Sequence, residues 1–346
     1  MSADLEVNGA VAPGYEAVLE AFAADLRGGS GLTVLRDGET VVELWEGWQD
    51  TARTRPWDET TLVNVNSVGK PIIALAAMTL VDRGLVGLDD DLARYWPSFR
   101  TPASVRHVLT HTAGLPMFEV ERPAAAWADW DVLCADLAAA DPLWTPGTVA
   151  AEHALTYGHL LGELVRRVDG RPAAKFVAEE IAEPYGLDLG FGLSDFTRCA
   201  DLEYDTPDWP DRMAGEPDSV RSRAVANPGG ARDVRILNSP LWRSASIPAV
   251  NLHATATAIA RFYALPQVAA LAQPQFTGVD QFIGRSVVWG LGVQIEPDGT
   301  WGQGGLGGNA GWFDPARRLA IGYVTRRLGD FAVVDRVDAA IAACTR

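Results

Sequence analysis

Hydrophobic and polar residues follow helical spacing in some parts of this 346-residue chain and strand-like alternation in others. Apolar positions recur at helical spacing over 14–26, and two β-rich runs then flank Asp37-Gly38, a dipeptide typical of hairpin turns. From residue 67 to about residue 185 the pattern is mostly helical. Residues 201–239 are rich in Pro, Gly, Asp and Arg without periodicity, so we expect long loops there.

The last third of the chain returns to strand-like patterns after one more helix. The expected elements, in order, are a helix over 251–265, a strand over 287–296, a glycine-rich stretch over 301–315, a strand over 318–325 and a helix over 331–344. Strands therefore lie at both ends of the chain, with helices between them.

This order predicts an α+β fold, with a mostly antiparallel sheet assembled from both termini and an inserted helical domain. We expect residues 1–66 and 245–346 to form the discontinuous sheet domain. Residues 67–244 should form the mainly helical domain with its loops, and the active site should lie between the two.

One apolar segment, VNVNSVGKPIIALAAMTLVDRG from Val63 to Gly84, contains a lysine. A lysine is rarely buried without a partner, so its position in a core-like helix requires a reason. Pro71 is tolerated only in the first helical turn, which places the start of the helix near Ser67. Residues three apart share a helix face, so Lys70 can reach the Ser67 hydroxyl and activate it as a nucleophile.

The chain resembles the serine β-lactamase-like superfamily, in particular its class C-related carboxylesterase branch, in four stretches. These are NVNSVGKP, VRHVLTHTAGLP, AEHALTYGHLLGELVRRVDGRP and WGQGGLGGNAGWFDPARRLAIGYV, in the family's order, and the resemblance covers about residues 32–324. It implies a β-lactamase/transpeptidase-like fold, with Ser67 as the acylated nucleophile and Lys70 as its partner. It also implies that Tyr157 is the phenol that shares the proton relay.

The chain departs from this family at two positions beside the expected site. Penicillin-recognising members usually have Tyr-x-Asn, and here the third position is His159. They also have Lys-Thr-Gly, or His-x-Gly in many esterases, where this chain has Gln303, Gly304 and Gly305. We expect these four residues to contact substrate. Because a neutral glutamine cannot hold a carboxylate as a cation does, uncharged acyl substrates are favoured.

The glycine-rich stretch from Gly302 to Gly311 fits the edge of an oxyanion site. A backbone without side chains can approach closely, which lets an N–H group reach the substrate carbonyl. We expect the oxyanion hole to use the N–H groups of Ser67 and Leu306.

Charge and composition exclude several other functions. A net charge of −16 argues against a nucleic-acid partner and against binding to an anionic membrane surface. The N-terminal stretch lacks the basic start and apolar core of a signal peptide, so we expect a cytoplasmic protein. His107 and His111 lack the glutamate of the zinc-protease motif, and we expect no metal and no cofactor.

The leading hypothesis is a serine hydrolase that cleaves small to medium uncharged esters through an acyl-enzyme on Ser67. An acyltransferase or an amidase would use the same Ser67, Lys70 and Tyr157 and differ in the acceptor or the bond cleaved. A catalytically silent binding protein on this scaffold is a further alternative, which Gln303 keeps open. The partner is a small-molecule acyl substrate in each enzymatic case, and the oligomeric state stays open.

Overall fold

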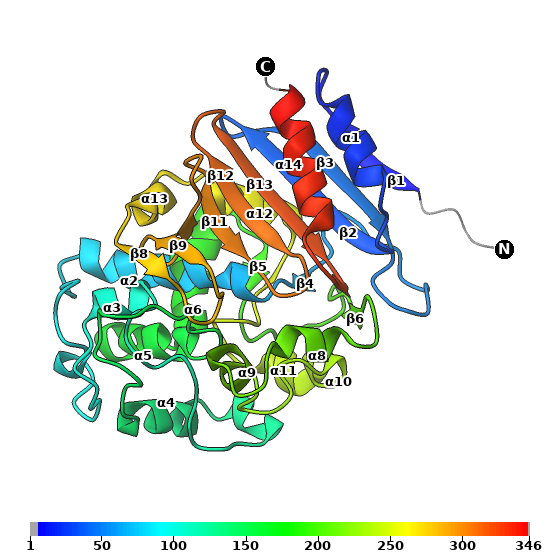
Figure 1. Cartoon of the computed structure of the whole chain (residues 1–346). Coiled ribbons are helices and arrows are strands. Elements are labelled where there is room, and N and C mark those ends of the chain that lie inside the picture. The colour runs from blue at the N-terminus through cyan, green and yellow to red at the C-terminus, as the bar shows by residue number, and fades with distance from the viewer. Residues whose placement is uncertain (1–5, 345–346) are drawn as a thin grey trace.

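The core of the molecule is a nine-stranded sheet whose strands come from the two ends of the chain (Figure 1). The structure, a computed structural model, describes residues 6–344. All neighbouring strands are antiparallel, in the order β1-β3-β2-β13-β12-β11-β10-β9-β8. Their bounds are β1 (Val7–Val11), β2 (Gly29–Arg36), β3 (Glu39–Gly47), β8 (Phe276–Val279), β9 (Ser286–Trp289), β10 (Gln294–Ile295), β11 (Trp301–Gly304), β12 (Ala310–Asp314) and β13 (Leu319–Thr325). The predicted α+β fold with an antiparallel sheet from both termini is confirmed.

The hairpin predicted at Asp37-Gly38 is present between β2 and β3. Both turn residues have positive φ, 53° and 85°, which matches the tight turns that suit twisted antiparallel strands. Strand β1 was not predicted. It lies at the sheet edge, and its three central residues are exposed, so its sequence has no alternating apolar pattern.

Helices cover both faces of the sheet. α1 (Glu16–Ala23) and α14 (Ala332–Cys344), close to the helices predicted near the two termini, pack together on one face, and α12 (Ala256–Tyr263) lies on the other (Figure 1). The apolar cluster under α1 and α14 includes Val18, Phe22, Leu32, Val333 and Val337. The remaining, larger core lies on the α12 side and continues into the helical part of the molecule.

Two glycines allow α12 to lie directly on the sheet. Gly311 of β12 and Gly322 of β13 are cross-strand partners. A Cβ at Gly322 would lie 2.3 Å from the Ala256 carbonyl oxygen, and one at Gly311 would lie 2.5 Å from the Ile259 side chain. The helix therefore sits on a patch of the sheet without side chains, which sets its height above strands β12 and β13.

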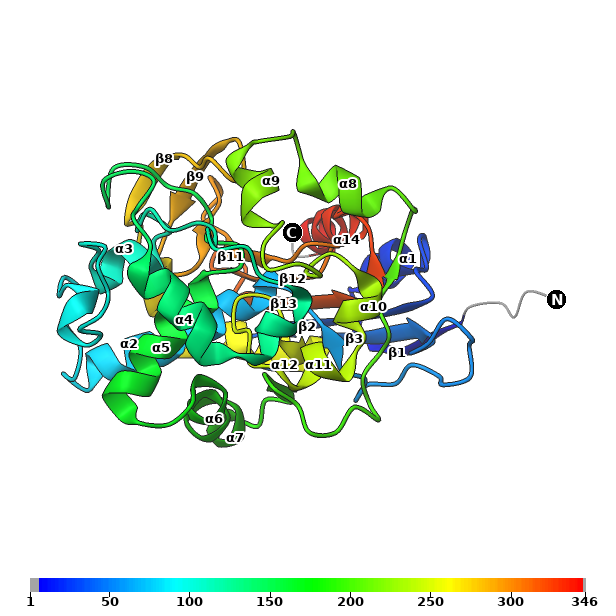
Figure 2. The ribbon, with the colours of Figure 1, turned by 90° about the horizontal axis from the view of Figure 1, so that it is seen from below.

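The helical part lies to one side of the sheet (Figure 2). Its main helices are α2 (Lys70–Asp82), α3 (Val105–Leu109), α4 (Trp130–Ala139), α5 (Tyr157–Asp169) and α6 (Ala173–Val177). α2 packs against α5. A 3₁₀ turn over Ser67–Gly69 directly precedes α2. The mostly helical pattern predicted between residues 67 and 185 is confirmed.

Residues 201–239 are not simply long loops, as the sequence led us to expect. They contain β6 (Glu203–Tyr204), α8 (Trp209–Ala214), α9 (Val220–Ala224) and α10 (Val234–Leu237). Each helix spans fewer than two turns, too short for a period of 3.6 residues to become visible. Local caps define two of them instead, because Ser219 and Asp233 accept hydrogen bonds from backbone N–H groups of α9 and α10.

The remaining elements are short. The strands are β4 (Val63–Asn64), β5 (Leu189–Gly190) and β7 (His253–Ala254) in a small second sheet, and β14 (Arg327–Leu328) paired with β6. The helices include α7 (Glu183–Tyr185), α11 (Pro240–Ser244) and α13 (Pro266–Ala269), and further short helical turns connect the elements. Within residues 6–344 no helix has the length and apolar character needed to cross a membrane. The predicted domain boundaries at residues 66 and 245 stay a prediction.

Gly322→Ala should lower the free energy of unfolding by about 1–3 kcal/mol, because the added methyl group forces α12 away from the sheet. Thermal unfolding followed by circular dichroism measures this. Gly229→Ala is the matched control, because its Cβ would have only one neighbouring atom, at 3.8 Å. Equal stability of the two variants would contradict this account of the helix–sheet contact.

Candidate active site

Ser67 and Lys70 lie together, as their spacing predicts. Ser67 opens the 3₁₀ turn and Lys70 is the first residue of α2, so both side chains project from the same face. The Lys70 Nζ donates a hydrogen bond to the Ser67 Oγ at 2.6 Å. This contact places an amine within proton-transfer distance of a hydroxyl.

The Lys70 ammonium is completely buried, and each of its three N–H donors has an acceptor. Besides Ser67, they are the Glu152 Oε1 at 3.0 Å and the Ala249 carbonyl oxygen at 3.3 Å. Burial lowers the pKa of Lys70 below its ordinary value, and the negative charge of Glu152 offsets part of this effect. The site thus holds a lysine that can lose its proton more readily than one in water.

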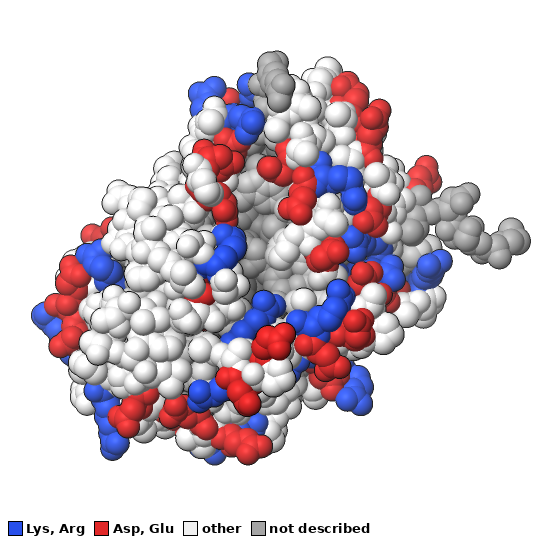
Figure 3. Space-filling model, viewed as in Figure 1, with Lys and Arg blue, Asp and Glu red and all other residues white. Residues whose placement is uncertain are grey.

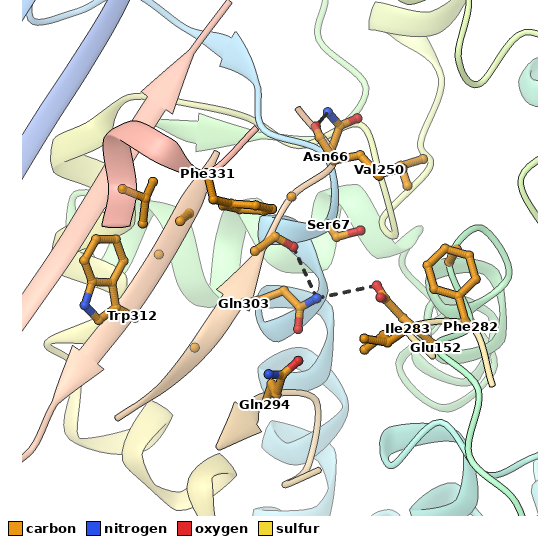
Figure 4. Close-up of a pocket in the computed structure, with 18 of the residues that line it drawn as sticks. Asn66, Ser67, Glu152, Val250, Phe282, Ile283, Gln294, Gln303, Trp312 and Phe331 are labelled. Atoms are coloured by element: carbon orange, nitrogen blue, oxygen red, sulfur yellow. Dashed lines mark hydrogen bonds between the residues drawn. The ribbon is translucent and has the colours of Figure 1, made fainter. Parts of the chain in front are cut away.

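Glu152 is the residue of this site that the sequence analysis missed. Its carboxylate contacts Lys70 and lies 3.5 Å from the Gln303 Nε2 (Figure 4). Its backbone N–H donates to the Asp280 carboxylate at 3.1 Å, which fixes the segment that precedes α5. A signal was present: a buried lysine requires an acidic partner, and Glu152 is the one acidic residue in the stretch 143–162.

Strand β11 and the turn after it form one wall of the site. Gln303, Gly304, Gly305 and Leu306 line the same cavity as Ser67, and the Gln303 Oε1 is buried without a protein partner among the described residues. A Cβ at Gly305 would lie 2.3 Å from the Val65 carbonyl oxygen, so only glycine lets this wall approach the nucleophile so closely. The positions of Gln303, Gly304 and Gly305 agree with their predicted contact with substrate, which stays a prediction.

The backbone before Ser67 is held in a strained conformation. Asn66 has φ 51° and ψ −131°, and its side-chain amide donates to the Leu306 carbonyl oxygen at 2.6 Å. Strain of this kind persists only where surrounding contacts enforce it, and it often marks functional sites. The contact links Ser67 to Leu306, the two residues predicted to supply the oxyanion hole. That function of their N–H groups stays a prediction.

The cavity in front of Ser67 has a volume of about 600 Å³, within the usual range for small-molecule sites. Its apolar lining includes Val250, Phe282, Ile283, Trp301, Trp312 and Phe331. Among residues 6–344 no three His, Cys, Asp or Glu side chains are grouped as metal ligands. The site therefore combines a buried serine–lysine pair with a mostly apolar chamber.

Comparison with known proteins identifies the family, because residues 16–343 match the family model described as Beta-lactamase. The chain belongs to the beta-lactamase family. It is 32% identical to the esterase/beta-lactamase LipL of Mycobacterium tuberculosis (strain ATCC 25618 / H37Rv), over 93% of this chain and 83% of the relative.

Solved structures agree with this assignment. The crystal structure of a family VIII carboxylesterase has a TM-score of 0.87 and 30% identity, with coverage of 98% of this chain and 100% of that one. A penicillin-binding protein homologue from Caulobacter crescentus has a TM-score of 0.87 and 32% identity, with the same coverage. The family and fold predicted from the four sequence stretches are confirmed.

Tyr157 does not lie where the resemblance to this family placed it. Its hydroxyl donates weakly to the Leu109 carbonyl oxygen at 3.4 Å, and Tyr157 is absent from the cavity lining. The hydroxyl lies next to Gly292, where an added Cβ would be 2.6 Å from it. Burial raises the pKa of this phenol far above its ordinary value, which opposes a role in proton transfer. The structure therefore places Glu152, five positions before Tyr157, in contact with Lys70.

His159 does not contact the cavity either, so its predicted role in substrate binding is wrong. The ring is fully buried and stacks on Trp130 with centroids 4.7 Å apart, and Phe118 and Trp127 pack around it. Burial lowers its pKa to about 4, so the ring is neutral near neutral pH. His159 is a residue of the aromatic core between α4 and α5.

Lys70→Met should lower the free energy of unfolding by about 3–5 kcal/mol, because it leaves the Glu152 carboxylate buried without its counter-charge. Urea denaturation measures the loss. The double variant Lys70→Met/Glu152→Gln removes both charges and should recover a large part of it. A double variant whose loss equals the sum of the two single losses would show that the two charges do not interact.

Proposed function

We propose that this beta-lactamase family member is a serine hydrolase that cleaves ester bonds through an acyl-enzyme on Ser67. The observation that carries the proposal is the 2.6 Å contact between the Ser67 Oγ and the buried Lys70 amine, at the edge of a mostly apolar cavity. The relatives named as esterases support an ester as the bond that is cleaved.

The first step is a proton transfer inside the Lys70–Glu152 pair. The ammonium gives one proton to the carboxylate across the 3.0 Å contact, and the pair becomes an amine and a carboxylic acid. Burial favours this neutral form over two separated charges. The amine can then accept the proton of the Ser67 hydroxyl.

Acyl transfer follows from this arrangement. The Ser67 oxygen attacks the ester carbonyl as its proton passes to Lys70, and the bond to the alcohol breaks as a proton returns to the departing oxygen. The predicted N–H groups of Ser67 and Leu306 would stabilise the negative charge on the carbonyl oxygen. In the second half, water attacks the acyl-enzyme, and the same pair accepts its proton and returns one to Ser67.

Glu152 takes the proton-relay function that the sequence analysis gave to Tyr157. It contacts Lys70, lines the cavity and carries a group that can both hold and release a proton. The Gln303 amide makes a weak 3.5 Å contact with the same Glu152 oxygen that faces Lys70. The wall formed by β11 and the turn after it therefore presents a neutral amide next to the reacting carbonyl. A neutral amide favours a substrate with an uncharged group beside its scissile ester.

A cytoplasmic location is part of the proposal. Its support is that Cys134, Cys199 and Cys344 are free thiols, as is usual in a reducing compartment. Detection of the protein in the membrane or extracellular fraction of its native cell would contradict it.

Ser67→Ala should abolish hydrolysis of a short p-nitrophenyl ester and labelling by a fluorophosphonate probe, because it removes the atom that carries the acyl group. Release of p-nitrophenol and the mass of the labelled protein measure the two effects, and circular dichroism checks that the variant is folded. Substantial turnover by the folded variant would refute the acyl-enzyme on Ser67.

Glu152→Gln should lower kcat by about 100-fold or more, the usual scale for the loss of a proton-transfer group. Tyr157→Phe should change kcat by less than about threefold, because its hydroxyl does not reach the reacting atoms. Steady-state kinetics on the same ester compares them. The reverse ranking of the two variants would restore the tyrosine as the relay group.

A further inference from the structure

Two arginines from the segment between β6 and α10 line the cavity that contains Ser67. Arg221 lies on α9, and Arg232 lies in the loop before α10. Neither has a carboxylate within 4.0 Å in the described part of the chain, although most of its arginines form such ion pairs. Asp211 attracts Arg232 from a greater distance.

Both guanidinium groups rest on the backbone of α8. The Arg221 Nε donates to the Met213 carbonyl oxygen at 3.0 Å, and the Arg232 Nη1 donates to the Pro210 carbonyl oxygen. These carbonyls are three residues apart, which is about 4.5 Å along a helix, so the two positive groups are held near each other.

Carbonyl oxygens orient the guanidinium groups but do not neutralise them. Arg221 also lies over the Phe282 ring at 5.5 Å, and the Arg232 Nε is buried without a partner among the described residues. Each guanidinium has five N–H donors, and only some of them are used. Two neighbouring guanidinium groups with unused donors and no carboxylate within 4.0 Å are available to bind an anion together.

Besides Glu152, three acidic residues line the cavity, and they come from other elements than the two arginines. Glu296 follows β10 and pairs with Arg285, and Asp335 and Asp338 belong to α14. In Figure 3, Lys and Arg side chains lie directly below the central hollow, whereas Asp and Glu side chains flank it above. The two arginines therefore enter the cavity lining from α9 and from the loop before α10, whereas these three carboxylates enter it from other elements.

We propose that Arg221 and Arg232 form an anion subsite that binds a carboxylate at the end of the substrate remote from the scissile ester. The substrate class is then a monoester of a dicarboxylic acid, or an ester of a hydroxy acid, with a neutral group beside Gln303. This inference rests on the proposed ester hydrolysis. Arginine suits this task because its planar donors match the two carboxylate oxygens.

Kinetics with matched substrates tests the subsite. The substrates are p-nitrophenyl monoesters of dicarboxylic acids of increasing chain length, each compared with its ω-methyl ester. At the best length, kcat/KM of the wild type should favour the free carboxylate by roughly 10- to 150-fold, the value of a charge-assisted hydrogen bond. Arg221→Gln/Arg232→Gln should bring this ratio close to one.

Arg223→Gln is the matched control, because Arg223 lies on the same helix but is exposed and does not line the cavity. It should keep the wild-type ratio. A wild-type ratio near one at every chain length, or a ratio that survives in the double variant, would overturn the subsite.

Calorimetry separates this inference from the proposed function, because it needs no turnover. Folded Ser67→Ala protein should bind the monomethyl ester of the preferred dicarboxylic acid at least about 10-fold more tightly than the dimethyl ester. The Arg221→Gln/Arg232→Gln changes should remove the difference. Equal affinity for the two esters refutes the subsite, whereas selective binding without hydrolysis by the wild type refutes the ester hydrolase and leaves the subsite intact.

Discussion

The burial of the Lys70 ammonium is the constraint on which the rest of the site depends. An ammonium group without contact with water is tolerated only when each donor has an acceptor and a negative charge lies close by. Ser67, Glu152 and the Ala249 carbonyl satisfy these conditions from three separate parts of the chain. The single charge of Lys70 therefore holds Ser67, Glu152 and the loop before β7 in fixed positions.

Close backbone contacts keep this arrangement rigid. Gly305 lets the turn after β11 touch the backbone before Ser67, and Gly311 with Gly322 lets α12 lie on the sheet that carries this turn. Asn66, in its strained conformation, adds a hydrogen bond to Leu306. The wall that faces the substrate carbonyl is thus fixed by the sheet, and the nucleophile is fixed by α2.

The distribution of charge adapts the family scaffold to a particular chemistry. Near Ser67 the cavity has the neutral Gln303 amide and a carboxylate, Glu152, that is already paired with Lys70. The arginines without carboxylate partners lie instead on the α8–α9 side of the cavity. The four stretches that carry the family resemblance could not reveal this arrangement, because neither arginine lies in them.

The sequence by itself determined the features that depend on local spacing. The hairpin at Asp37-Gly38, the start of the helix at Ser67 and the contact between Ser67 and Lys70 follow from turn chemistry and helix geometry within a few residues. The order of strands and helices determined the fold class, because the two terminal groups of strands pair edge to edge in one sheet and helices cover its apolar faces.

Only the tertiary structure decided which distant residues complete the site. Glu152 and Tyr157 lie in one short stretch, and their spacing contains no information about which of them meets Lys70. The turn into α5 directs Glu152 to the cavity and buries Tyr157 near the Leu109 carbonyl. The sequence likewise could not show that His159 is buried or that Arg221 and Arg232 line the cavity. Exposure to a cavity is a property of the packed chain and leaves no periodic pattern in the sequence.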